Sequence, residues 1–218
     1  LSIEMNLYKF KECLKNKSLS RVLQNKQFEN ITISGKTIDL GAKNGKASYY
    51  RFLNLEYSEI DYVDINPTES NVLNLNLEEK LPIEEKTFNS VIAINIFEHI
   101  FNIKNLIEEI YRILDHKGKL IGSTPFIKEY HADPADYYRY TQDFYKKVFE
   151  KSGFVNIELI LIGQGVFHLI AENVGKLIKI KILRYLFWEL CINCDKLLNI
   201  FYKNNKNYYC SIIFLCEK

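Results

Sequence analysis

The chain has 218 residues, 47% of them hydrophobic, so it can bury one sizeable core and fits a single α/β domain with additions. Its formal net charge of +2 argues against a broad basic surface for nucleic acid. Its five cysteines are odd in number and do not form two C-x-x-C pairs, which argues against a disulfide framework or a zinc site. No apolar stretch follows a basic start, so we expect a cytoplasmic protein.

The first 30 residues are expected to form one or two helices that cap the domain. Apolar residues recur at helical spacing, for example at Leu7, Phe10 and Leu14 and again at Leu19 and Val22. Residues 31–218 are then expected to form the main domain.

The next segment, residues 37–45, is a β-branched stretch that ends in an acid and two glycines. Thr37 to Leu40 predicts a buried strand, and Gly41 and Gly45 predict a tight turn whose main chain a ligand can approach closely. Asp39 would repel a phosphate and attract a cation. An ordinary strand-to-helix turn with two glycines explains the same residues about as well.

The turn does not fit the dinucleotide fingerprint G-x-G-x-x-G. That pattern needs glycines at positions 41, 43 and 46, and the chain has Gly41, Lys43 and Lys46. After the turn, the spacing of Ala47, Tyr50 and Leu53 predicts a helix on one face of the sheet.

A second strand is expected over Ile60 to Asp64, which ends in an acid 25 residues beyond Asp39. An acid at this edge can accept hydrogen bonds from both ribose hydroxyls of an adenosine-containing ligand. The alternative for Asp64 is a turn formed by Asp-Ile-Asn-Pro.

The remaining segments alternate between strand and helix patterns. Short apolar runs predict strands at 72–75, 88–95, 119–125 and 155–162, and an amphipathic helix is expected over 103–114 with Lys117 and Gly118 as its end signal. A second helix is expected to end at Gly153. This alternation predicts an α/β fold with a parallel sheet, helices on both faces, and ligands at the carboxyl edge of the strands.

Several segments in this order resemble a known family. Leu81-Pro82-Ile83, then Phe88 to Ile92, then Phe97-Glu98-His99-Ile100 are similar to the signature of type 11 methyltransferases, which are class I enzymes that use S-adenosyl-L-methionine (SAM). Asp39, Gly41 and Gly45 resemble that family's first loop, with Lys43 in place of its middle glycine. The resemblance implies a Rossmann-like, mostly parallel sheet of seven strands with an antiparallel last strand, expected here over residues 208–216.

The resemblance also implies where the cofactor SAM would lie. The main chain at Gly41 and Gly45 would follow the methionine part, together with Asp39. Asp64 and Ile65 would hold the ribose. Asn76 and Leu77 would contact the adenine, and Asn95 would lie beside the sulfonium.

Residues 130–141 form the most polar and aromatic segment of the chain. They resemble the His-x-x-Pro-x-Asp-Tyr-Tyr-Arg-Tyr-Thr segment of methyltransferases in glycan and polysaccharide pathways, which implies a small-molecule or saccharide acceptor. His131 is the first candidate for a general base and His99 the second. Asp136, Tyr138 and Arg139 would orient the acceptor, and nothing in the sequence requires a metal. A proline-centred turn packed by tyrosines is the structural alternative.

Residues 167–205 are apolar but interrupted by charges, whereas a membrane span needs about 20 largely uncharged residues. We therefore expect an inserted helical pair that forms a lid, a surface for a second copy, or a peripheral contact with a membrane.

Two other functions share parts of this pattern. An NAD-dependent sugar oxidoreductase would use the same fold and an acid at position 64, but its glycines are missing here. A degenerate methyltransferase-like binding module is the non-enzymatic alternative, suggested by Lys43, Asn76 and Asn89.

Overall fold

The computed structural model describes residues 2–42 and 47–218. By internal contacts the chain divides into two compact units. The sheet unit comprises residues 28–125, 129–160 and 212–218, and the helical unit comprises residues 1–27, 126–128 and 161–211. We describe each unit by itself.

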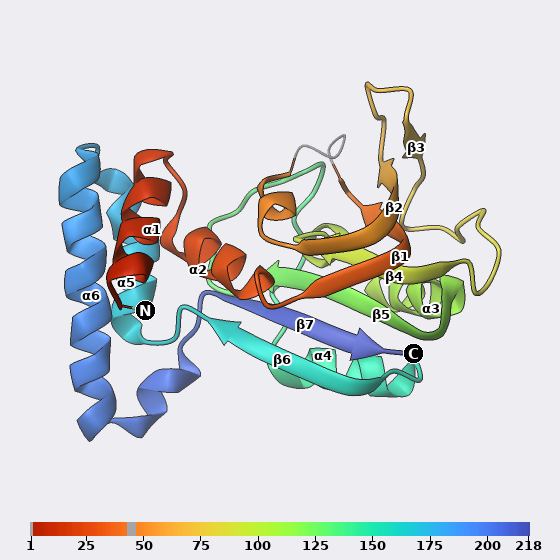
Figure 1. Ribbon diagram of the computed structural model, residues 1–218. Coiled ribbons are helices and arrows are strands. Elements are labelled where there is room, and N and C mark those ends of the chain that lie inside the picture. Colours follow the sequence, from red (N-terminus) through yellow and green to blue (C-terminus); the bar gives the residue numbers. More distant parts are fainter. Residues whose placement is uncertain (1, 43–46) are drawn as a thin grey trace. The chain divides into compact units, whose positions relative to one another are not determined.

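The described residues form one seven-stranded sheet with the order β3-β2-β1-β4-β5-β7-β6 (Figure 1). Its strands are β1 (Thr32–Leu40), β2 (Asn54–Asp64), β3 (Val72–Asn74), β4 (Phe88–Ile94), β5 (Leu114–Pro125), β6 (Val155–Ile162) and β7 (Ser211–Glu217). The pairs β1–β2, β1–β4, β2–β3 and β4–β5 are parallel. In Figure 1 the arrow of β7 runs opposite to those of β5 and β6. The expected α/β fold with a mostly parallel sheet and an antiparallel last strand is confirmed.

The core of the sheet unit forms where apolar faces of helices meet the central strands. Residues 90–94 of β4 are all buried, as expected of a strand covered on both faces. Helix α3 (Ile103–Ile113) buries apolar residues at helical spacing, among them Leu106 and Ile110. Helix α4 (Gln142–Lys151) begins at Thr141, whose hydroxyl accepts a hydrogen bond from the Phe144 N–H, and its Phe149 packs against Phe214 of β7.

The helix expected after the glycine turn is wrong. Residues Ser48–Arg51 form only a short 3-10 turn, η2, and β2 begins at Asn54 instead of Ile60. Strand β2 pairs with β1 from its first residue, with Thr32 opposite Asn54, so the segment between the turn and Asn54 is too short for a regular helix.

The expected boundary between the third helix and the fifth strand is also wrong. Helix α3 ends at Ile113 and β5 starts at Leu114, five residues before the expected start. The register against β4 shifts between the pairs Phe88–Leu114 and Ser90–Lys119. Lys117 has a φ of 61° inside this irregularity. The pair Lys117-Gly118 therefore marks a bulge within a strand and not the end of a helix.

The helical unit contains α1 (Ser2–Leu14), α2 (Leu19–Phe28), α5 (Val166–Val174) and α6 (Lys181–Phe201). Cys13, Val22, Ala171 and Trp188 belong to its buried core. The buried carboxylate of Asp195 accepts hydrogen bonds from main-chain N–H groups in the first turn of α5, which stabilises that end of the helix.

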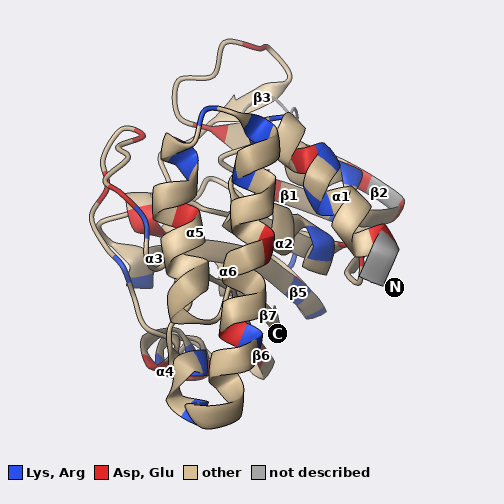
Figure 2. Cartoon of the chain, turned by 90° about the vertical axis from the view of Figure 1, so that its left-hand side faces the viewer, with Lys and Arg blue, Asp and Glu red and all other residues tan. Residues whose placement is uncertain are grey.

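Helix α6 has an exposed apolar stripe that includes Leu183, Leu186, Leu190 and Leu197. Figure 2 shows that much of this helix carries no charge. Within residues 2–42 and 47–218, no helix combines the length and the apolar character needed to cross a membrane. The contact of this helical pair with a membrane or a second copy stays a prediction.

Candidate functional site

The turn after β1 depends on glycine at position 41. Gly41 has a φ of 74°, and its N–H donates to the Val63 carbonyl at 2.8 Å. A Cβ there would lie 2.0 Å from Cδ1 of Ile96. The sequence therefore needs glycine both for its backbone conformation and for the space that Ile96 occupies. Lys43 and Gly45 lie outside the described residues.

Asp39, at the end of β1, is completely buried and is held by two tyrosines that the sequence analysis did not assign to the site. It accepts hydrogen bonds from the hydroxyls of Tyr49, at 2.6 Å, and Tyr50. Burial raises the pKa of Asp39 to about 7, the two hydroxyls lower it, and the charge of Asp64 raises it. The tyrosine turn thus explains why an acid is tolerated inside the sheet, while its contact with SAM stays a prediction.

The residues assigned to the ribose lie at the end of β2, and those assigned to the adenine lie after β3. Asp64 is half-buried and accepts a hydrogen bond from the Ile65 N–H at 2.8 Å, while the Ile65 side chain is 47% exposed. Asn76 is exposed and accepts a hydrogen bond from the Glu78 N–H at 3.0 Å, and Leu77 is buried. Asp64 is therefore partly exposed, and the Ile65 side chain is accessible to a ligand.

Asn95 follows β4 and has a φ of 55°. Its N–H donates to the Ser123 carbonyl at 2.8 Å, and the Ser123 hydroxyl donates to its Oδ1 at 3.0 Å. These contacts fix the amide next to the end of β5. Gly41, Asp64 and Asn95 lie at the carboxyl ends of three parallel strands that neighbour one another, so the structure brings them to the same edge of the sheet.

The segment after β5 is held by a buried ion pair. The guanidinium of Arg139 donates to both carboxylate oxygens of Asp136, at 2.5 and 2.7 Å, and the Asp136 side chain is only 2% exposed. Asp136 also accepts from the His131 N–H at 2.9 Å. The Arg139 guanidinium lowers the pKa of Asp136 to about 2. These two residues, expected to orient an acceptor, here bind each other and shape the loop.

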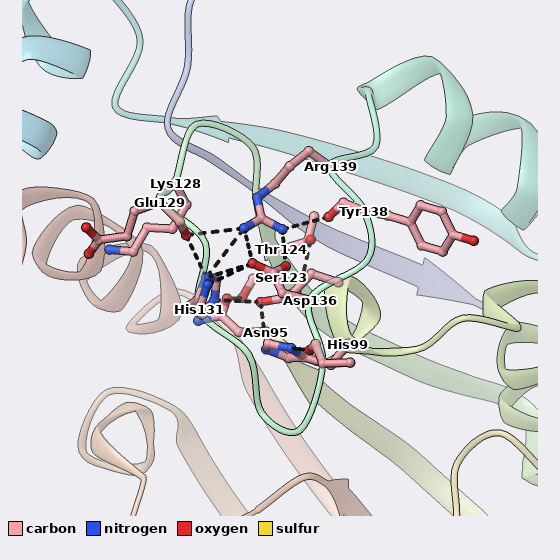
Figure 3. Close-up of polar contacts among 12 residues, drawn as sticks. Asn95, His99, Ser123, Thr124, Lys128, Glu129, His131, Asp136, Tyr138 and Arg139 are labelled. Carbon is pink, nitrogen blue, oxygen red and sulfur yellow. Dashed lines mark hydrogen bonds and ion pairs between the residues drawn. The ribbon is translucent and has the colours of Figure 1, made fainter.

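His131 of this segment and His99 of the turn after β4, both labelled in Figure 3, approach one buried carboxylate, that of Glu98. Glu98 follows β4 in the short turn η3 (Phe97–His99), and its side chain is fully buried. Nε2 of His99 and Nε2 of His131 each lie 3.7 Å from Oε1 of Glu98. That distance is an ion-pair contact and is too long for a hydrogen bond.

The other ring nitrogen of each histidine lies near a main-chain carbonyl, and Nδ1 of His131 also lies 3.4 Å from Nη2 of Arg139 and from Oδ2 of Asp136. Nδ1 of His99 lies 2.5 Å from the Ala135 oxygen, and Nδ1 of His131 lies 3.0 Å from the Glu129 oxygen. A carbonyl only accepts, so the shorter contact of each Nδ1 favours a proton on that nitrogen, and in a neutral ring the lone pair then lies on Nε2, which faces Glu98. Glu98 is the main cause that raises the pKa of His131, against the opposing effect of burial.

Tyr138, the third residue expected to orient the acceptor, points its ring away from the two histidines in Figure 3. It belongs to an aromatic group with Phe101, Tyr137 and Tyr140. Phe101 and Tyr137 are 63% and 47% exposed. The aromatic surface of the loop is thus formed mainly by neighbours that the sequence analysis did not single out.

Glu98 is the clearest functional candidate missing from the sequence-based assignment. It was visible only as one letter of the Phe97 to Ile100 segment. Its importance depends on a contact with His131, 33 positions further along the chain, which no local pattern shows.

Comparisons with known proteins agree with this fold. Residues 26–122 match the model of a methyltransferase domain, which is slightly under half of the chain. No curated protein matches the chain. A SAM-dependent methyltransferase from Archaeoglobus fulgidus has a TM-score of 0.57 at 16% identity, over 91% of this chain and 92% of that one.

Two further solved structures share this fold and carry different names. Phosphoethanolamine N-methyltransferase 2 from Haemonchus contortus, solved with SAM, has a TM-score of 0.55 at 16% identity over 91% of this chain. The match covers 52% of that enzyme, so this chain spans about half its length. The [4+2]-cyclase SpnF has a TM-score of 0.56 at 14% identity, over 91% of this chain and 81% of that one. Residues 26–122 are thus similar to a methyltransferase domain, and the solved structures share the fold of the chain.

Proposed function

We propose that this protein transfers the methyl group of SAM to a hydroxyl of a small-molecule or glycan-linked acceptor, with a sugar hydroxyl as the favoured target. The observation that supports this most is the convergence of Gly41, Asp64 and Asn95 at one sheet edge, next to the loop of His131. The cofactor supplies an electrophilic methyl group, so the protein mainly has to position the two partners and exclude water.

Cofactor binding is assigned to the carboxyl edge of β1 to β4. Gly41 has the positive φ of a tight turn at this edge, and Asp64 can accept hydrogen bonds from ribose hydroxyls. Asp39, Ile65, Asn76, Leu77 and Asn95 complete the set that we assign to the cofactor.

The acceptor is assigned to the loop that carries His131. Exposed rings of Phe101 and Tyr137 offer flat apolar faces for the CH groups of a sugar. His131 accepts the proton of the acceptor hydroxyl on its Nε2 atom, and His99 is the second candidate for this role. The acceptor oxygen then bonds to the methyl carbon while the carbon–sulfur bond breaks, which leaves S-adenosylhomocysteine. The ion pair between Asp136 and Arg139 holds the loop in place, and Tyr138 contributes to the aromatic surface of the loop.

The cofactor assignment is tested without knowledge of the acceptor. Asp64→Ala should weaken the binding of S-adenosylhomocysteine at least tenfold, because each charge-assisted hydrogen bond contributes about 1.5–3 kcal/mol and about 1.4 kcal/mol is one decade. Calorimetric titration of the folded variant measures this. Asp61→Ala, an exposed acid in the same strand, is the matched control and should bind as the wild type does. Equal affinity of the Asp64 variant and the wild type would remove Asp64 from the site.

A nicotinamide-linked sugar oxidoreductase is the second candidate, and only the acid after β2 favours it. In the same titration, NAD in place of S-adenosylhomocysteine should give no heat of binding. Binding of NAD alone would reverse the order of the two candidates, and binding of neither would favour a non-catalytic module.

A further inference from the structure

We propose that Glu98, His99 and His131 form a binding site for one divalent transition-metal cation of the zinc type. One donor atom from each residue lies within 4.8 Å of the other two. Two imidazole nitrogens and one carboxylate oxygen are a ligand set that such cations favour, and it leaves coordination positions open. This inference does not depend on methyl transfer.

The buried carboxylate of Glu98 is the first argument. Its side chain is fully buried, and Oε1 accepts no hydrogen bond from any described residue. A buried charge without a hydrogen-bonded partner is costly. The Nε2 atoms of the two histidines each lie 3.7 Å from Oε1.

The state of the two rings is the second argument. Because both Nδ1 atoms donate to main-chain carbonyls, both neutral rings present lone pairs to a negatively charged oxygen. With both rings neutral this arrangement is repulsive, and either protonation of a ring or a cation between the three atoms relieves it. A cation removes the repulsion for both histidines together, whereas one proton satisfies only one ring.

The surrounding contacts match those of metal sites. In metal sites, the second ring nitrogen of a histidine ligand usually donates its N–H to a carbonyl or carboxylate, and ligating carboxylates also accept hydrogen bonds. Here the second oxygen of Glu98 accepts from the Thr124 hydroxyl at 3.4 Å. Metal–nitrogen bonds of about 2.0–2.1 Å place tetrahedral ligands about 3.4 Å apart. The two 3.7 Å contacts with Glu98 need to shorten by a few tenths of an ångström, and the donor atoms of the two histidines, which lie within 4.8 Å of each other, must also approach.

The site is accessible at its outer side. The His131 side chain is 36% exposed, compared with 10% for His99 and none for Glu98. A cation can therefore enter, and an acceptor hydroxyl can reach an open coordination position. A metal-bound hydroxyl loses its proton more easily. Cation and proton use the same Nε2 lone pair, so in the loaded protein His131 is a ligand and its role as a base is confined to the empty protein.

Titration of the chelator-treated full chain with Zn²⁺ tests the proposal. We expect one equivalent to bind to the wild type, and Co²⁺ at the same site should give the visible absorption of a low-symmetry complex. His131→Asn, at the most exposed ligand, should lower Zn²⁺ affinity at least tenfold, and Glu98→Gln should do the same. His116→Ala removes an exposed histidine elsewhere and serves as the control.

The outcomes separate this proposal from the proposed function. No binding of Zn²⁺ to the wild type, or equal binding by wild type and His131→Asn, overturns the cation site. His131→Asn keeps a polar side chain at a partly exposed position, so it gives an answer even if Glu98→Gln fails to fold. S-adenosylhomocysteine is titrated separately into the metal-free protein. If it does not bind, the proposed function is contradicted, and the Zn²⁺ titration still tests the cation site.

Discussion

At the scale of single residues, Asp39 shows how a local contact changes the chemistry that a motif suggests. The acid lies where a methyltransferase loop has one, yet its carboxylate is enclosed by the hydroxyls of Tyr49 and Tyr50. Those tyrosines occupy the place of the expected helix. The same two residues therefore account for the short turn after β1 and for the environment of the acid.

This enclosure predicts a pH dependence of stability. The pKa of Asp39 is about 7 in the folded protein, above its ordinary value of 3.8, so the folded state binds the proton more tightly than the unfolded state. The contribution of Asp39 to the free energy of unfolding is therefore fully present below about pH 4, and it is lost as the pH rises through 7. Asp39→Asn cannot ionise, so its stability relative to the wild type should increase between pH 5 and pH 8, by on the order of 2 kcal/mol.

Urea unfolding at several pH values measures this difference. Asp61→Asn, an exposed acid on the neighbouring strand, should show the same pH profile as the wild type. A flat difference between Asp39→Asn and the wild type would mean that Asp39 is ionised without penalty in the folded protein.

At the scale of elements, hydrophobic periodicity predicted the strands and helix α3 because each of these elements buries a continuous set of apolar residues. Strand β6 lies exactly where its sequence predicted it, at 155–162. The wrong boundaries, at η2 and at the start of β5, lie where pairing with a neighbouring strand outweighs the local pattern. The residues of the candidate site likewise fall into those that local sequence predicts and those that it does not. Residues that follow strand ends could be predicted, whereas Glu98 could not, because its partner His131 comes from another loop.

The loop after β5 owes its shape to the pair Asp136 and Arg139. Arg139→Lys keeps the charge but loses the fork that donates to both carboxylate oxygens. We expect a loss of stability of about 1.5 kcal/mol, because the Asp136 carboxylate is buried and would keep only part of its hydrogen bonding. Hydrogen exchange over residues 129–141 should become faster in this variant.

Arg51→Lys replaces an exposed arginine in the same unit and provides the control for that experiment. Its stability should stay within about 0.5 kcal/mol of the wild type. Unchanged exchange in residues 129–141 of Arg139→Lys would show that other contacts hold the loop.

At the scale of the whole molecule, the assigned cofactor residues all belong to the sheet unit, while the exposed apolar stripe of α6 belongs to the helical unit. Each unit has its own core, so unfolding need not be a single cooperative transition. A ligand stabilises only the parts of a protein whose unfolding abolishes its site. This distinction makes the location of the cofactor site measurable without a structure of the complex.

S-adenosylhomocysteine at 100 times its dissociation constant should therefore stabilise the sheet unit by about 2.7 kcal/mol. Hydrogen exchange resolved by peptide should slow in residues 28–125, and peptides from residues 161–211 provide the internal reference. NAD at the same concentration should leave both regions unchanged. Slower exchange in residues 161–211 alone would move the cofactor out of the sheet unit, because protection follows the region whose opening releases the ligand.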